Sequence, residues 1–286
     1  MNKNIDNFAL IIGAMKSGTT SLFYYLAEHP EVAPIEGIEG KEPHFFSYTK
    51  NFNRGIDWYR AKWNCKPEHK VALEGSTTYA MYPKYGDVAS RIASVENANF
   101  KFIYVIRNPF RRIESHMVHL LAGGHQKKPE LIEEHISYTE YAKQINQFVD
   151  RFGRQQVHIL FLEDLQEHPQ RELEKICNFL EIDSNYQFQR VSMIRNSKQT
   201  LNLNPIVRNI YRLPLVKYFA RLISPEIRQR FYAILARKQS YTVNLSKQEQ
   251  EMILKRLNSD LKQLKTVYDL DVYQKWNLDN ICQSSN

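Results

Sequence analysis

The chain has 286 residues, a net charge of +8 and three cysteines, with ordinary apolar (43%) and charged (24%) fractions for a globular protein. No apolar run approaches the ~20 residues of a membrane span, and the N-terminus lacks a basic-then-apolar signal, so we expect a cytoplasmic protein without a membrane span. The widely spaced cysteines have neither zinc-site spacing nor the pattern of a disulfide framework.

The first predicted elements are a strand, a tight loop and a helix within residues 8–26. Phe8–Ile12 is a short apolar run typical of a buried parallel strand, and Gly13 permits the turn out of it. The first N–H groups of the following helix have no partner within the helix and carry the positive end of its dipole, which makes them an anion site. The stretch therefore predicts a phosphate-binding loop built from Lys16, Ser17, Gly18, Thr19, Thr20 and Ser21.

The position of the lysine indicates the kind of phosphate ligand. Gly13 and Gly18 have the separation of an ATPase P-loop, but Thr19 stands where that motif has its lysine, and the lysine lies inside the loop as Lys16. A lysine inside the loop suits a ligand whose single 5′-phosphate is bridged to the group being transferred. A nucleotide or nucleoside kinase with an altered P-loop is the alternative, and it would need Mg²⁺.

Further along the chain, apolar runs alternate with helical patterns. Such alternation predicts an α/β fold, a three-layer sandwich with a central parallel sheet, and the absence of a linker predicts a single domain over 1–286. Residues 30–70 form a long connection, a type that is usually functional. The predicted strands are Val71–Leu73, Lys101–Ile106 and Val157–Leu162, and the predicted helices are 18–28, 84–95, 109–122, 138–152, 168–181 and a last one that begins at Ser246 with a capping box to Glu249.

A second anion site is predicted in the run FKFIYVIRNPFRRIESHM. Arg107 directly follows a strand, and Ser115 lies one to two turns into the helix that opens at Pro109. An arginine here can grip a phosphate with two hydrogen bonds, and a serine can add one. By itself Arg107 could equally be a structural ion-pair partner, but beside the loop at 13–21 it favours a second phosphate clamp.

The positive charge is concentrated in residues 195–240, which hold ten Lys/Arg and one acid. This excess indicates an anionic ligand, an acidic acceptor or a membrane surface, or only a solvated helix face. A non-enzymatic module that docks on nucleic acid or anionic membrane ranks last, because no nucleic-acid-binding motif is present.

Two phosphate sites, no Mg²⁺-binding pattern and a lysine inside the loop characterise one family. The sequence resembles the sulfotransferases that use 3′-phosphoadenosine 5′-phosphosulfate (PAPS), with GAMKSGTTSL matching their first loop and Arg107 followed eight residues later by Ser115. The heparan-sulfate branch, which includes N-deacetylase/N-sulfotransferases and 3-O-sulfotransferases, is more similar than the phenol and steroid enzymes. Its counterparts here are KEPHFF at 41–46, RGIDWY at 54–59 and LEGSTTY at 73–79.

The resemblance implies a donor and a way of holding it. PAPS would be the donor and adenosine 3′,5′-bisphosphate (PAP) the product, with no metal. The first loop would hold the 5′-phosphosulfate, and Arg107 with Ser115 the 3′-phosphate. A late phosphate loop is matched only loosely, by Asn196, Ser197 and Lys198.

The resemblance also has departures that bear on the acceptor. Several polysaccharide enzymes carry a lysine in the segment matching LEGSTTY, where this chain has Gly75, so the likeness does not extend to a lysine-assisted contact from that position. The transmembrane anchor of the Golgi enzymes is not found, which makes a small metabolite as plausible an acceptor as a saccharide. The sequence does not separate a hydroxyl acceptor from an amine, and it says nothing of the oligomeric state.

Residues for the chemistry follow from the same likeness. Glu42, in the pattern E-x-x-F-F, is the candidate base, and His44 is the runner-up because histidine titrates near neutrality. Lys16 is expected to stabilise charge on the leaving phosphate. Glu74 could orient the acceptor or Lys16, or form a structural ion pair. Trp58, Tyr59 and Tyr79 could line an acceptor pocket, or belong to the core.

Overall fold

A computed structural model describes residues 6–36, 40–191 and 241–278. Within them a five-stranded sheet has the order β2-β3-β1-β4-β5, and every neighbouring pair is parallel. This is the predicted central parallel sheet. Its strands are β1 (Asn7–Gly13), β2 (Val32–Pro34), β3 (Val71–Glu74), β4 (Asn99–Ile106) and β5 (Val157–Phe161).

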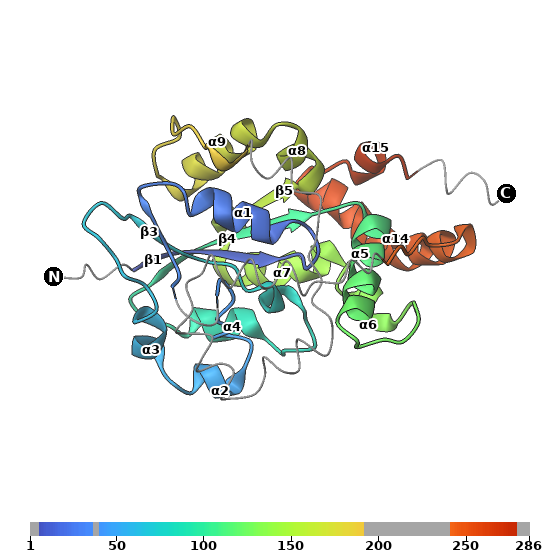
Figure 1. The fold of residues 1–286 in the computed structure, drawn as a ribbon, viewed down its shortest axis with the longest axis horizontal. Helices are drawn as coiled ribbons and strands as arrows, with labels where there is room; N and C mark the ends of the chain where they lie inside the picture. Colours follow the sequence, from blue (N-terminus) through green and yellow to red (C-terminus); the bar gives the residue numbers. More distant parts are fainter. Residues whose placement is uncertain (1–5, 37–39, 192–240, 279–286) are drawn as a thin grey trace, which may run out of the picture.

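Helices cover both faces of the sheet, as the alternation of strand and helix patterns predicts. Figure 1 shows α1, α8 and α9 above the sheet and α4 and α7 below it, with α5, α6 and α14 at the right of the view. The helices are α1 (Thr19–Leu26), α2 (Thr49–Phe52), α3 (Ile56–Arg60), α4 (Val88–Ala93), α5 (Pro109–Ala122), α6 (Glu133–Ser137), α7 (Tyr141–Phe152), α8 (Leu162–Glu167), α9 (Pro169–Leu180), α14 (Lys247–Tyr268) and α15 (Val272–Trp276), with short 3₁₀ turns η1 (Thr77–Ala80) and η2 (Arg154–Gln156).

The strands are buried because they are apolar on both faces. Phe8 through Ile12 of β1 are at most 2% exposed, and Phe102 to Ile106 of β4 are fully buried. A parallel strand between two helical layers needs such a continuous apolar run, since neither face meets water. The four runs predicted as strands are therefore confirmed as β1, β3, β4 and β5.

The long connection at 30–70 holds elements that the sequence patterns did not predict. Val32–Pro34 forms the edge strand β2, in register with β3 from Val32 opposite Val71. Helices α2 and α3 follow in the same connection. Their aromatic residues join the core, where Phe45 stacks on Tyr59 with ring centroids 4.5 Å apart. The connection is thus a packed part of the domain.

Helix ends agree with their sequence signals. Ser246 caps α14 and forms the predicted capping box with Glu249, each side chain bonding the other residue's backbone N–H. Asn108 caps α5 and Pro109 is its first residue. One face of α14 is buried, since Ile253, Leu257, Leu261, Leu264 and Tyr268 are at most 5% exposed.

Two further observations concern membrane crossing and the cysteines. Of the described helices, none combines the length and the apolar character that crossing a bilayer requires. Cys65 and Cys177 are both buried, and Cys177 is a free thiol. The basic segment 195–240 lies outside the described residues.

Candidate active site

The predicted phosphate loop, residues 14–18, connects β1 to the N-terminus of α1. The backbone N–H of Ala14 donates to the carbonyl of Val105 on β4 (2.9 Å), which ties the loop to the neighbouring strand. Lys16 and Gly18 both have positive φ, 70° and 78°. The side-chain oxygen of Ser17 is buried and has no hydrogen-bond partner among the described residues. A buried hydroxyl left without a partner is costly, and a phosphate oxygen would satisfy it.

Gly18 is required at its position for two reasons. Its φ of 78° is unfavourable for residues with a side chain, and a Cβ placed there would collide with Leu162 at the start of α8. We expect Gly18→Ala to lower the midpoint of thermal unfolding and to weaken nucleotide binding, because the loop must move away from Leu162. Gly86→Ala is the matched control, since Gly86 also has positive φ (68°) but would meet only the flexible end of Arg91. Equal losses in the two variants, measured by differential scanning fluorimetry, would contradict the assigned role of the collision.

Two arginines fasten the phosphate loop from the end of β4 and from α5. Arg107 Nη1 donates to the carbonyl of Lys16 at 2.9 Å, and Arg112 Nη1 donates to that of Met15 at 3.4 Å. Arg112 is fully buried, and its Nε and Nη2 donate to Thr139 Oγ1 and to the carbonyl of His135. Sequence reasoning missed Arg112, although it stands only five residues after Arg107 in the same motif.

The site has a surplus of positive charge. Burial and the neighbouring Arg107 guanidinium lower the pKa of Lys16, while the Glu42 carboxylate opposes this shift. Burial likewise lowers the pKa of Arg107. Among the described residues no ion pair joins either cation to a carboxylate. Cations that are partly buried without a counterion favour the binding of an anion between them.

Glu42 lies in the loop that follows β2, near enough to Lys16 to affect its pKa. Its Oε1 forms an ion pair with Lys41 Nζ. Its Oε2 accepts from Thr77 Oγ1 at 3.5 Å and lies 3.8 Å from His44 Nε2. The side chain is 28% exposed, so the carboxylate is held in place yet reachable. Lys41 and Thr77 are contacts that the sequence analysis did not foresee.

His44 is fixed by neighbours that follow β3. Its Nδ1 is 2.9 Å from Thr78 Oγ1, which in turn lies 2.6 Å from Ser47 Oγ, and its backbone N–H donates to Ser76 Oγ at 3.1 Å. The hydroxyl on Nδ1 orients the ring, so that Nε2 faces Glu42. The structure therefore brings together both predicted base candidates.

Glu74, at the end of β3, is fully buried. Neither carboxyl oxygen has a hydrogen-bond partner of ordinary geometry, and burial raises its pKa to about 8, although the hydroxyls of Tyr79 and Tyr59 act in the opposite direction. At neutral pH the group is thus largely protonated. Such burial argues against direct contact with an acceptor, and Glu74 has no ion-pair partner among the described residues.

The raised pKa makes stability depend on pH. Between the ordinary value of 4.5 and about 8 the unfolded chain ionises Glu74 while the folded protein keeps its proton, so the folded state binds more protons and loses stability as the pH rises. We expect the wild type to lose roughly 2 to 3 kcal/mol more than Glu74→Gln between pH 5.5 and pH 7.5. Urea unfolding at both pH values checks this. Parallel losses in the two proteins would show that Glu74 ionises normally.

The aromatic residues predicted for an acceptor pocket lie mainly in the core. Tyr59 is fully buried and Tyr79 is 2% exposed. Trp58 is partly buried and is flanked by Arg54 and Lys62, whose cationic groups are 3.9 and 3.8 Å from the ring centroid. Their described contacts hold the connection at 40–60 against the sheet, which is the core alternative considered for them.

The remaining predicted residues are distributed as follows. Thr19, Thr20 and Ser21 form the first turn of α1, where Thr20 is exposed and Ser21 partly so. Ser115 is half-buried on α5, the helix that Arg107 precedes. Asn196, Ser197 and Lys198 lie outside the described residues, so their predicted part in phosphate binding stays a prediction.

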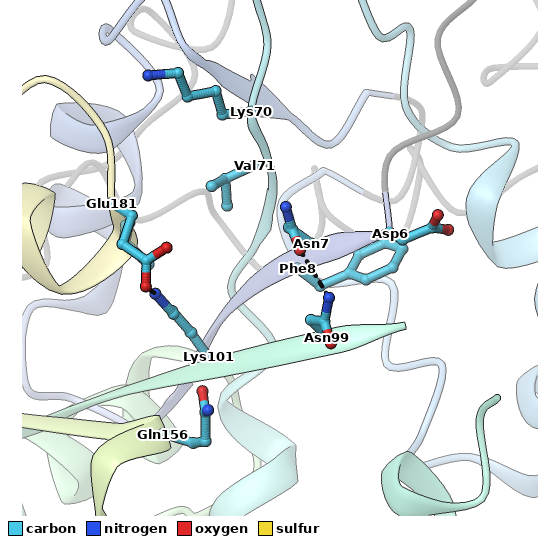
Figure 2. A pocket seen from close by; sticks show the side chains of 10 residues that line it. Asp6, Asn7, Phe8, Lys70, Val71, Asn99, Lys101, Gln156 and Glu181 are labelled. Atoms are coloured by element: carbon cyan, nitrogen blue, oxygen red, sulfur yellow. Dashed lines mark hydrogen bonds and ion pairs between the residues drawn. The ribbon is translucent and has the colours of Figure 1, made fainter. Parts of the chain in front are cut away.

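A cavity of about 730 Å³ lies at the amino ends of the strands, on the side of the sheet opposite to the phosphate loop. Figure 2 shows it between the starts of the strands, near Asn7, Val71 and Asn99. Its lysines are already paired, Lys101 with Glu181 and Lys70 with Glu31, each at 2.6 Å. Because its cations are neutralised and no loop motif borders it, this cavity is not the anion site.

Comparison with known proteins agrees with this geometry. The sequence model of the family described as "Sulfotransferase domain" matches residues 6–207, most of the chain. The chain belongs to the sulfotransferase family. The predicted phosphate loop at 13–21, the predicted clamp of Arg107 with Ser115 and the whole described sheet fall inside the matched region.

Two curated relatives of this sulfotransferase show how far the similarity extends. Human heparan sulfate glucosamine 3-O-sulfotransferase 5 is 27% identical over 191 residues, which cover 61% of this chain and 53% of that protein. The bifunctional heparan sulfate N-deacetylase/N-sulfotransferase 1 of Caenorhabditis briggsae is 26% identical over 198 residues, 60% of this chain and 22% of that protein. The chain thus spans about half or less of the length of these relatives.

The fold is shared with a solved sulfotransferase. The structure of a sulfotransferase from Alicyclobacillus acidocaldarius superposes with a TM-score of 0.58 at 20% identity, covering 95% of this chain and 98% of that one. The predicted fold class and the predicted family resemblance are therefore confirmed.

Proposed function

We propose that this sulfotransferase transfers a sulfuryl group from PAPS to a hydroxyl or amine of its acceptor. The observation that carries the proposal is the pair of cations, Lys16 and Arg107, which meet at the N-terminus of α1 without a carboxylate partner in the described structure, while Glu42 lies close enough to influence Lys16. A bisphosphorylated nucleotide supplies the missing negative charge. Family membership supports the same donor.

The donor set fits such a nucleotide. The unpartnered Ser17 hydroxyl and the N–H groups at the start of α1 would hold the 5′-phosphate, with Gly18, Thr19, Thr20 and Ser21 lining the turn. Arg107 and Ser115 would hold the 3′-phosphate. Asn196, Ser197 and Lys198 remain a proposal from the resemblance alone.

The chemistry needs a base and a stabilised leaving group. Glu42 takes the proton from the acceptor as the acceptor oxygen or nitrogen bonds to sulfur. The bond between sulfur and the 5′-phosphate oxygen breaks, and the electron pair stays on that oxygen, where Lys16 stabilises the charge. His44, 3.8 Å from Glu42, is the alternative base. The nucleotide leaves as PAP, and no residue in this scheme requires a metal.

A saccharide acceptor has support from a cavity of about 540 Å³ that is lined in part by Tyr48, Lys50, Lys84 and Tyr85. The ring centroid of Tyr48 is 5.2 Å from that of His44, which does not itself line the cavity. Burial raises the pKa of Tyr48 to about 12, so its hydroxyl stays a neutral donor. Aromatic walls with hydroxyl and ammonium donors suit a sugar ring, and both curated relatives described above are heparan sulfate enzymes. A small metabolite of similar shape is the other acceptor class within this proposal.

A cytoplasmic location is also part of the proposal. The buried free thiol of Cys177 suits a reducing compartment.

The test is to supply sulfur-labelled PAPS with a heparosan hexasaccharide and a panel of small alcohols and amines, in the presence of a metal chelator. Label transferred to an acceptor supports the proposal. The kinase alternative predicts instead phosphate transfer from ATP that the chelator abolishes. Consumption of ATP together with inertness toward PAPS would refute the sulfotransferase assignment.

A further inference from the structure

Lys41 has an unusual environment for a lysine in a loop. Its side chain is only 10% exposed. Its Nζ forms the ion pair with Glu42 Oε1 and donates to the carbonyl of Gly75 at 2.9 Å. The backbone N–H of Gly75 in turn donates to the carbonyl of Lys41, also at 2.9 Å. The loop after β2 and the end of β3 are thus joined at this one lysine.

The ammonium group occupies the space beside Gly75. A Cβ built on Gly75 would lie 3.6 Å from Lys41 Nζ, and its other neighbours, Phe23 and Ile11, would be at ordinary contact distances. The cation that stands beside the backbone of residue 75 therefore arrives from residue 41.

We propose that Lys41 is a positioning residue for Glu42, holding one carboxylate oxygen of Glu42 from within the loop after β2. The inference rests on the proposed function, with Glu42 as the base. It assigns a task to each carboxylate oxygen. Oε1 is committed to Lys41, so Oε2, with its longer contacts of 3.5 Å to Thr77 and 3.8 Å to His44, is the oxygen that receives the acceptor proton.

The physical reason is the neighbourhood of Glu42. The side chain is partly exposed and is attached to a loop, so a single weak hydrogen bond from Thr77 would leave its carboxylate free to take several rotamers. A buried charged partner restricts those rotamers, and displacement of a catalytic group by about 1 Å can reduce rate about 100-fold. A charge-assisted bond at Oε1 supplies that restriction.

A purely structural role makes a different prediction. If Lys41 only anchored the loop through the Gly75 carbonyl, its removal would be harmful, but a lysine introduced at residue 75 would bring no recovery. The two roles are separated by moving the ammonium from one residue to the other. Gly75 allows this because its φ is not positive and its Cβ position is free of collision.

The experiment compares the wild type, Lys41→Met and the double variant Lys41→Met/Gly75→Lys. With labelled PAPS and the heparosan hexasaccharide, we expect kcat of Lys41→Met to fall about 100-fold with little change in the KM for PAPS, and the double variant to regain about tenfold. PAP binding, measured by calorimetry, should be the same in all three, because the side-chain hydrogen bonds of Lys41 in the described part of the chain go to Glu42 and Gly75. A single variant with unchanged kcat, or a double variant no better than the single, overturns the proposal.

Crystal structures of the PAP complexes give a readout that needs no acceptor. Glu42 should leave Thr77 in Lys41→Met and return in the double variant; an unmoved Glu42 overturns the inference. If the wild type transfers sulfate from PAPS to none of the acceptors tested, the saccharide proposal fails. The crystal structures then still decide the role of Lys41. If Lys41→Met does not fold, Lys41→Gln, which keeps a donor but loses the charge, replaces it with the same expectations.

Discussion

Replacing Lys16 by methionine should lower kcat by about 100- to 1000-fold while the protein stays folded. Lys16 is partly buried, and its ammonium lies close to Arg107 and Glu42 without an ion-pair partner in the described structure. Its charge is therefore available for the 5′-phosphate oxygen as the bond to sulfur breaks. Methionine keeps most of the length of the side chain and removes the charge together with its N–H donors. The measurement is the turnover of labelled PAPS under saturating donor.

The control for this variant is the same substitution at a lysine far from the site. Lys70 lies at the amino edge of the sheet, is about half exposed and pairs with Glu31. Lys70→Met should leave turnover unchanged. If Lys16→Met retained wild-type kcat and only its KM for PAPS rose, Lys16 would bind the ground state alone and its assigned part in leaving-group stabilisation would be wrong.

Replacing Arg107 by glutamine should weaken PAP binding about 100-fold, since a charged hydrogen-bond donor to a phosphate is lost. Arg107 follows β4, and its burial lowers its pKa without removing its charge. Its Nη1 also donates to the Lys16 carbonyl at 2.9 Å, so the loop itself is affected. Calorimetric titration with PAP measures the total loss.

A second ligand separates the two effects of Arg107. Adenosine 5′-monophosphate lacks the 3′-phosphate, so its affinity should fall only as far as the loop is disturbed. Arg111 is an exposed arginine on α5, the helix that Arg107 precedes, and it pairs with Glu114, so Arg111→Gln is the matched variant and should bind PAP normally. Equal losses for PAP and for the monophosphate would mean that Arg107 shapes the loop without contacting the 3′-phosphate.

The sequence predicted well those features that depend on neighbouring residues. The apolar runs became β1, β3, β4 and β5, and Pro109 and Ser246 marked helix starts as expected. Val32–Pro34 was missed because three residues ending in proline carry too little pattern, and this strand exists through its pairing with β3. A short edge strand of this kind is specified by tertiary contacts.

The site was predicted in its residue types more than in its contacts. Lys16, Arg107 and Glu42 follow the carboxyl ends of different strands. Because the strands are parallel, these ends lie on the same side of the sheet, and the three residues are brought to that side. The ion pair of Lys41 with Glu42, and the bond from buried Arg112 to the Met15 carbonyl, depend on side-chain directions that no spacing encodes. The protonated state of Glu74 likewise follows from its burial, which a sequence pattern does not reveal.

Calorimetric titration of the wild-type protein with PAP, alongside ATP with Mg²⁺, tests the central claim most directly. Lys16 and Arg107 have no carboxylate partner among the described residues, and they lie at the start of α1. They should therefore give saturable one-to-one binding of PAP, weaker binding of adenosine 5′-monophosphate and no Mg²⁺-dependent binding of ATP. Absence of heat with PAP at millimolar concentration, or preference for ATP with Mg²⁺, would contradict the assignment of this site to a sulfuryl donor.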